Sequence, residues 1–82
     1  MHLEIITPDK KVFEGEVYSA TFPGSDGSFQ VLNDHAPLIS LLKDGMVVFK
    51  SKESTQQVNI TGGVVEVLKN NVILLADGLI GG

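Results

Sequence analysis

The chain has 82 residues, with ten acidic and six basic side chains, a net charge of −4 and no cysteine. This length predicts a single small domain, and 43% apolar residues suffice for a folded core. The acidic balance argues against binding nucleic acid or anionic lipid, and the lack of cysteine excludes disulfides and thiolate chemistry. The longest apolar run, residues 72–76, is far shorter than the roughly 20 residues that span a bilayer, so we expect no direct insertion into a membrane.

From the amino terminus onward, the chain reads as a series of short strands separated by turns. Pro8-Asp9 favours a turn, residues 23–27 predict a five-residue loop, and Asp44-Gly45 and Lys69-Asn70-Asn71 predict hairpin turns. This pattern predicts an all-β fold, a small β-sandwich or flattened barrel of about eight to ten short strands. The clearest expected strands are residues 3–7, 12–15, 17–22, 28–32, 46–50, 56–61, 64–68 and 72–76.

Residues 34–43 allow two interpretations. Three leucines at helical spacing, with Asp34 as a cap and Pro37 in the first turn, favour a helix. The same segment also suits a buried strand over residues 38–42, because proline begins a strand as readily as a helical turn. Periodicity alone leaves both open.

Few side chains are placed for chemistry. Glu14 and Glu16 flank Gly15, and strand alternation puts both carboxylates on one face. They would form an acid/base pair or, as we favour, two solvated charges beside a bend. His35 follows Asp34, but neighbouring residues on a strand point in opposite directions, and no second ligand stands at a recognised metal-binding spacing. We therefore expect no catalytic residue, no cofactor and no metal ion.

The chain ends in Gly81-Gly82, which suggests a different function class. A flexible C-terminal Gly-Gly is what ubiquitin-like modifiers and sulfur carriers present for adenylation, because only glycine threads a narrow active-site channel. The length suits such a β-grasp domain, whose single helix would be residues 34–43. Composition and pattern leave this alternative open.

The stretch from Pro23 to Leu38 resembles the hallmark of the epsilon subunit of F-type ATP synthases, which usually reads Pro-Gly-x-x-Gly-x-Phe-Gly-Val-Leu-Pro-Gly-His-Ala-Pro-Leu. The resemblance extends in order over residues 3–77 and makes residues 38–42 a strand, which removes the helix that a β-grasp domain needs. The other matching blocks are residues 3–8 and 12–17 (the family's opening), 42–47 (Leu-Lys-Pro-Gly-Val-Val), 62–67 (Gly-Gly-x-x-Glu-Val) and 71–77 (the final Val-x-x-Leu-Ala-Asp strand).

The chain departs from the family pattern at a few positions. Gln30 stands where the family has glycine, and Asn33-Asp34 stand where it has Pro-Gly. Both changes fall in the loop region that the family points toward the membrane rotor. The family also continues past Ala76-Asp77 into two C-terminal helices, which carry its inhibition of ATP hydrolysis and, in some members, ATP binding. We expect neither function of these 82 residues.

The resemblance implies a non-catalytic subunit of the central stalk, or rotor, of the proton-translocating F-type ATP synthase. One face of the sandwich would pack on the gamma subunit and one end would sit on the ring of c subunits. Through these contacts the subunit would couple proton flow to ATP synthesis. The catalytic alpha/beta head would be reached through the complex. The protein would be peripheral, on the cytoplasmic face of the bacterial inner membrane.

The resemblance also assigns parts of the chain. Residues 1–77 would form the β-sandwich domain and residues 78–82 a flexible tail. Six residues lie in or beside the loops that match the family's ring-facing region, and the resemblance implies that they are contact residues rather than catalytic ones. They are Ser28, Asn33, Asp34, His35, Ala36 and Pro37.

Overall fold

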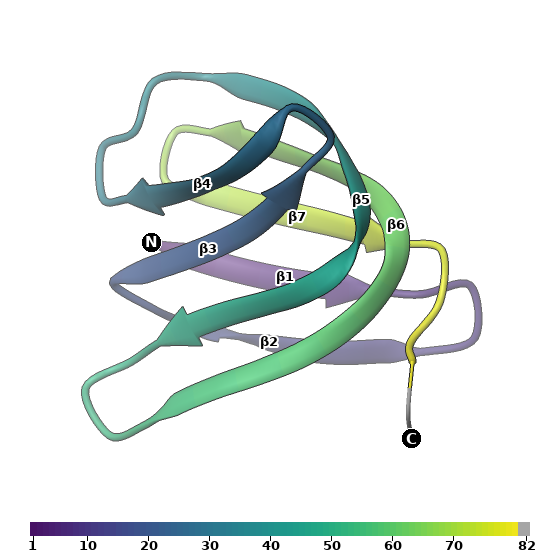
Figure 1. Ribbon diagram of the computed structural model, residues 1–82. Coiled ribbons are helices and arrows are strands. Elements are labelled where there is room, and N and C mark those ends of the chain that lie inside the picture. The colour runs from purple at the N-terminus through teal and green to yellow at the C-terminus, as the bar shows by residue number, and fades with distance from the viewer. Residues whose placement is uncertain (81–82) are drawn as a thin grey trace.

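The computed structural model describes residues 1–80, which contain strands and turns but no helix. The prediction of an all-β sandwich is confirmed (Figure 1). Residues 1–80 contain seven strands, fewer than expected, because two of the strands are long. They are β1 (His2–Ile6), β2 (Lys11–Glu16), β3 (Ser19–Gly24), β4 (Gly27–Leu32), β5 (Leu38–Lys50), β6 (Thr55–Leu68) and β7 (Asn71–Ala76).

The strands form one continuous sheet, in the order β2-β1-β7-β6-β5-β3-β4, that folds over on itself. β5 and β6 curve around one side of the molecule, so that each contributes to both layers (Figure 1). In the first layer, β2, β1 and β7 continue into the second half of β6 and the first half of β5. In the second layer, β4 and β3 continue into the second half of β5 and the first half of β6.

The bend in β6 occurs at two glycines in the left-handed region. Gly62 has φ 78° and Gly63 has φ 151°, conformations that L side chains rarely adopt. A Cβ on Gly63 would overlap the backbone of β7, where the Cα of Ala76 would be 2.9 Å away. The two glycines therefore allow β6 to bend and to pass close to β7.

The core lies between the two layers, where alternate residues of each strand point inward. In β7 the alternation is complete, with Val72, Leu74 and Ala76 buried between exposed neighbours. The layers also meet through aromatic side chains, since the ring centroids of Phe13 and Phe49 lie 4.5 Å apart. The largest fully buried side chains are Phe22, Phe49, Leu3, Ile5, Ile60, Leu74, Val31, Val47, Val65, Val67 and Val72.

Two turn predictions are wrong. Asp44-Gly45 lies inside β5 instead of forming a hairpin turn. A Cβ on Gly45 would come within 2.8 Å of the Cβ of Pro23, so this glycine serves the close passage of β5 beside β3. The five-residue loop over 23–27 is also shorter than expected, because β3 runs to Gly24 and β4 begins at Gly27.

Other local predictions are confirmed. Residues 38–42 form the start of β5, so the helix needed by the β-grasp alternative is not present in the described part of the chain. Lys69 and Asn70 form a two-residue turn between β6 and β7 with positive φ at both positions, as type I′ hairpins require. Residues 78–80, assigned by sequence to the tail, run beside β6, where Leu79 pairs with Ile60. Gly81-Gly82 lie outside the described residues.

Candidate interaction surfaces

The loop between β4 and β5 gathers five of the six residues predicted to face a rotor ring. Asn33, Asp34, Ala36 and Pro37 are exposed, and His35 is partly exposed. The backbone N–H of His35 donates to Leu32 O at 3.2 Å, and its Nδ1 donates to Ala36 O at 2.7 Å. The imidazole is thus hydrogen-bonded within its own loop.

Ser28 lies apart from that loop. It is the second residue of β4, whereas Asn33 follows the last residue of that strand. The two positions are therefore separated by nearly the whole strand, and Ser28 Oγ donates to Phe22 O at 3.4 Å. Within residues 1–80, β4 pairs only with β3 and forms an edge of the sheet. Ser28 and the loop therefore share the β4 edge but lie toward opposite ends of it.

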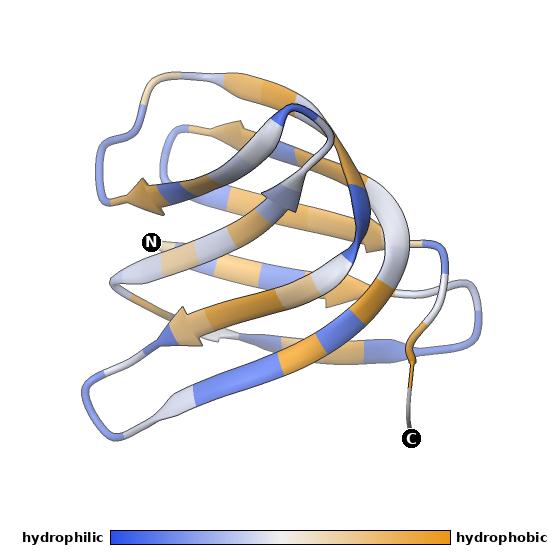
Figure 2. Ribbon diagram, in the orientation of Figure 1, coloured by the Kyte–Doolittle hydropathy of each residue, from blue (hydrophilic) through white to orange (hydrophobic). Residues whose placement is uncertain are grey.

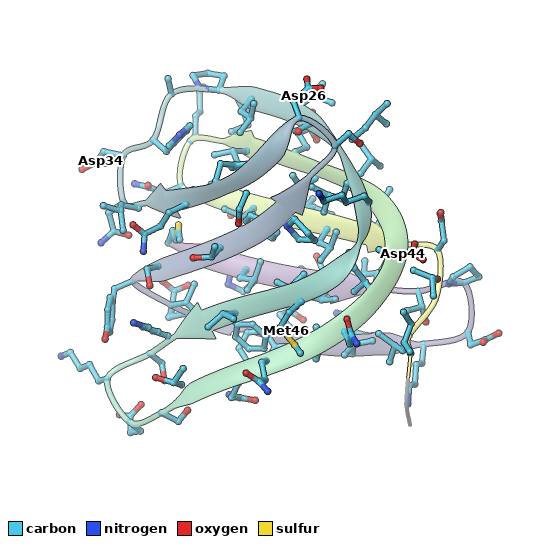
Figure 3. All side chains as sticks on the ribbon, in the orientation of Figure 1. Asp26, Asp34, Asp44 and Met46 are labelled. Atoms are coloured by element: carbon cyan, nitrogen blue, oxygen red, sulfur yellow. The ribbon has the colours of Figure 1, made fainter. Side chains whose placement is uncertain are left out.

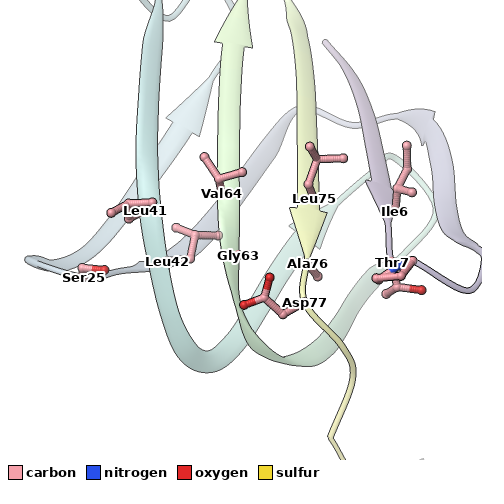
Figure 4. Close-up of a pocket in the computed structure, with 11 residues that line it drawn as sticks. Ile6, Thr7, Ser25, Leu41, Leu42, Gly63, Val64, Leu75, Ala76 and Asp77 are labelled. Atoms are coloured by element: carbon pink, nitrogen blue, oxygen red, sulfur yellow. The ribbon is translucent and has the colours of Figure 1, made fainter.

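The outer face of the first layer carries a row of apolar side chains that the sequence did not single out. Leu41, Val64, Leu75 and Ile6 are directly opposite one another across β5, β6, β7 and β1. Figure 4 shows them side by side on one face of the four strands. We call these four residues the apolar row. Leu41 is 68% exposed and Leu75 is 49% exposed, so both side chains are largely available to a partner.

Further features enlarge this surface. Ile39 and Ile73, two residues from Leu41 and Leu75 on the same strands, are also exposed. An open groove of about 640 Å³ is lined by all four residues of the apolar row, and Thr7, Pro8 and Asp77 also contribute to its lining. Contiguous exposed apolar residues of this kind mark interaction sites in soluble proteins.

The outer face of the second layer has a different character. Its corresponding row is Gln30, Thr21, Val48 and Gln57, which are opposite one another across β4, β3, β5 and β6. Figure 2 shows hydrophilic colouring along the first part of β6 and the turn that precedes it. Met46, labelled in Figure 3, is an exposed apolar residue of this layer, at 40%. The two outer faces are therefore not equivalent, and the apolar one belongs to the first layer.

Charged residues gather beside the apolar row on β1 and β2. His2 lies between two carboxylates, with Nε2 2.9 Å from Glu14 and Nδ1 3.1 Å from Glu16. The hydrogen bonds to Glu14 first, and then to Glu16, raise the pKa of His2 above its ordinary value. Lys11 lies 2.6 Å from Glu14 and 3.0 Å from Glu4. The hydrogen bond from Lys11 first, and then that from His2, lower the pKa of Glu14.

Glu14 and Glu16 are exposed, which is consistent with solvated charges, but both also pair with a partner that the sequence did not indicate. Both lie on one face of β2, as strand alternation predicted, but they bracket His2 of the neighbouring strand. The turn at Pro8-Asp9 indicated that the two strands pair. The spacing of the charged residues in the sequence did not indicate that His2 would lie between the two carboxylates. In the described residues, no three His, Asp or Glu side chains converge to hold a metal ion.

The described chain also offers no helix that is long and apolar enough to cross a membrane. Its structure is that of a small β-sandwich whose apolar outer face and exposed loop suit contacts with other proteins. An apolar surface of this kind is typical of a class of domains that bind other proteins. Comparisons with known proteins identify the family within this class.

The family model for the ATP synthase delta/epsilon chain β-sandwich domain matches residues 1–82. An ATP synthase epsilon chain of Campylobacter curvus is 43% identical over 81 residues, which cover 98% of this chain and 63% of that protein. An ATP synthase epsilon chain of Chlorobium limicola is 46% identical over 76 residues, 92% of this chain and 86% of that protein. The chain therefore belongs to the ATP synthase delta/epsilon family. It spans less than two thirds of several curated relatives, the Campylobacter protein among them.

Solved structures share the fold. A chain in the central stalk and c-ring structure of the Tetrahymena thermophila mitochondrial ATP synthase superposes with a TM-score of 0.81 at 21% identity, over 96% of this chain and 64% of that one. A chain of the Euglena gracilis mitochondrial ATP synthase superposes with a TM-score of 0.84 at 22% identity, over 90% of this chain and 48% of that one. At these identities, the likeness concerns the β-sandwich alone.

Proposed function

We propose that this chain is a non-catalytic subunit of the central stalk of a proton-translocating F-type ATP synthase. It would link the gamma subunit to the ring of c subunits and so couple proton flow to ATP synthesis. The catalytic alpha/beta head would be reached through the complex, on the cytoplasmic face of the bacterial inner membrane. Membership of the delta/epsilon family supports this proposal, as does the presence of one chain of this fold in a central stalk and c-ring structure.

The observation that carries the proposal is the apolar row. A chain that worked alone would gain nothing from Leu41 and Leu75 on its surface, because exposed apolar groups favour unwanted association. Subunit interfaces that persist are large, and the centre of each is apolar. We therefore assign the apolar row and its groove to the gamma subunit, which is the assignment that the sequence alone left open.

The second contact follows from the exposed loop. Asn33, Asp34, His35, Ala36 and Pro37 form a protruding surface next to the start of β5, whereas Ser28 lies toward the other end of the β4 edge. We assign this surface to the c-subunit ring. A small polar contact suits a role in orientation, because hydrogen bonds at an exposed site each add only about 0.5–1.5 kcal/mol.

Site-directed cross-linking in the assembled enzyme tests both assignments. A photoreactive amino acid would be placed at position 41, 35 or 46 of this chain, in membranes that contain the complete complex. We expect the probe at position 41 to cross-link to the gamma subunit and the probe at position 35 to the c subunit. Position 46 is the matched control, since Met46 lies on the same strand as Leu41 but on the other layer's outer face. A gamma product from position 46 with none from position 41 would refute the assignment.

A further inference from the structure

A pair of side chains ties the loop between β4 and β5 to the distant turn between β6 and β7. The Asp34 backbone N–H donates to Asn70 Oδ1 at 2.7 Å, and Asn70 Nδ2 donates to Asp34 Oδ1 at 3.0 Å. The two residues are 36 positions apart in the sequence. We call this pair of hydrogen bonds the clasp. Figure 3 labels Asp34, which lies at the protruding edge of the loop.

The clasp lies where the chain departs from its family. Asn33-Asp34 occupy the positions at which the family pattern has Pro-Gly, and Asp34 has φ 63°, in the left-handed region that glycine adopts most readily. The backbone conformation expected of a glycine is therefore kept, but a side chain has been added to it. Asn33, at the position of the proline, also leaves its own φ angle unrestricted. On both counts the loop needs support from outside itself.

Asn70 is a rigid anchor for that support. Its own φ is 62°, and it forms the two-residue turn together with Lys69. Its carbonyl oxygen accepts a hydrogen bond from the His2 N–H at 2.8 Å, which ties the turn to β1 as well. The β4–β5 loop carries the chain from the second layer to the first. The clasp fixes it at that crossing.

We infer that Asn70 is a positioning residue, which holds the loop that carries His35 in a single orientation through the clasp with Asp34. This inference rests on the proposed function in one respect, the assignment of the loop to the c-subunit ring. The hydrogen bonds and their effect on the loop do not depend on that assignment.

Amide hydrogen exchange tests the clasp in the chain itself. Asn70→Gly removes both hydrogen bonds but keeps a residue that accepts positive φ in the turn. We expect the Asp34 amide to exchange roughly three- to tenfold faster, the factor that corresponds to one exposed hydrogen bond. Asn71→Ala is the matched control, because the Asn71 side chain bonds within its own turn, to Lys69 O. It should leave the Asp34 amide unchanged, and urea unfolding should show both variants folded.

A swap of the two side chains provides the rescue. In the double variant Asp34→Asn with Asn70→Asp, the carboxylate at position 70 accepts both from the backbone N–H of residue 34 and from the side-chain amide at position 34, so two hydrogen bonds again join the loop to the turn. Exchange at position 34 should then return to that of the unaltered chain. Unchanged exchange in Asn70→Gly, or fast exchange in the swapped variant, would overturn the inference.

The same variants separate this inference from the proposed function. In membranes that carry the complete complex, Asn70→Gly should lower the number of protons pumped per ATP hydrolysed, and the swapped variant should restore it. If exchange responds as expected but pumping does not, the clasp positions the loop while the assignment of the loop to the ring is wrong. If pumping falls without any change in exchange, the clasp inference is wrong.

Discussion

Truncation of the apolar row gives a direct measure of its role. Leu41 is 68% exposed in the isolated domain, so a partner that covers it removes about two thirds of a leucine side chain from water. Full burial of such a side chain stabilises by about 1.5–3 kcal/mol, so the share left for the partner is about 1–2 kcal/mol. Leu41→Ser should therefore weaken binding to the gamma subunit roughly five- to thirtyfold. The fold should lose less than about 1 kcal/mol, because little of the side chain is buried within the domain.

Isothermal titration calorimetry of the purified gamma subunit against this chain would measure the effect. Leu75→Ser provides a second point in the same row, with a smaller exposed fraction of 49% and hence a smaller expected loss. Met46→Ser is the matched control on the opposite outer face. It removes a comparable apolar side chain from the same strand as Leu41, and it should change the affinity less than twofold.

The result that would refute this reasoning is specific. If both leucine variants bind gamma as tightly as the unaltered chain while Met46→Ser binds more weakly, the gamma subunit contacts the second layer. The apolar row would then have to serve another partner. Urea unfolding of each variant keeps loss of binding separate from loss of folding, because an unfolded variant would show no cooperative transition.

Three further predictions concern the fold, the charged network and the loop. Gly63→Ala should lower the free energy of unfolding by at least about 2 kcal/mol in urea titrations, whereas Gly27→Ala, also at positive φ but with no atom near the added Cβ, should cost less. The pKa of His2 is raised in the folded state, so the pairing of His2 with its carboxylates stabilises the fold. This stabilisation is complete below the pKa of the unfolded state, about 6.5, and is lost as pH rises through the pKa of the folded state. His2→Gln should therefore reduce the change of the urea midpoint with pH, and an unchanged pH dependence would contradict the pairing of His2. His35→Ala should weaken proton pumping modestly, by the effect of about one hydrogen bond, and leave ATP hydrolysis intact; loss of hydrolysis in an assembled complex would contradict a contact role.

The sequence predicted what depends on neighbouring residues. Short runs of strand-forming residues predicted β7 and the second half of β6, and Lys69-Asn70-Asn71 predicted the turn between them. Asp44-Gly45 shows where such reasoning fails. Its composition is that of a hairpin turn, yet Gly45 is needed for the close passage of Pro23 on another strand. A residue's local preference does not reveal which distant backbone will lie beside it.

The candidate surfaces show the same division. The loop over residues 33–37 could be identified because its residues are consecutive and resemble a family motif. The apolar row could not, since its four members come from four strands and meet only through the register of the sheet. The His2 network was missed for the same reason, as His2 and Glu16 become partners only when β1 and β2 pair.

β5 directly connects the two surfaces of this small domain that we assign to the c-subunit ring and to the gamma subunit. The loop over residues 33–37 leads directly into β5, and Leu41 of the apolar row is the fourth residue of that strand. Over this stretch β5 pairs with β6 from Leu38 onward, and the clasp holds the loop at its start. A load applied to the loop would therefore pass into paired backbone within a few residues, instead of through a flexible linker. A rigid connection between the surface assigned to the ring and the surface assigned to gamma follows from this continuity, and it would be lost if the loop moved independently of β5.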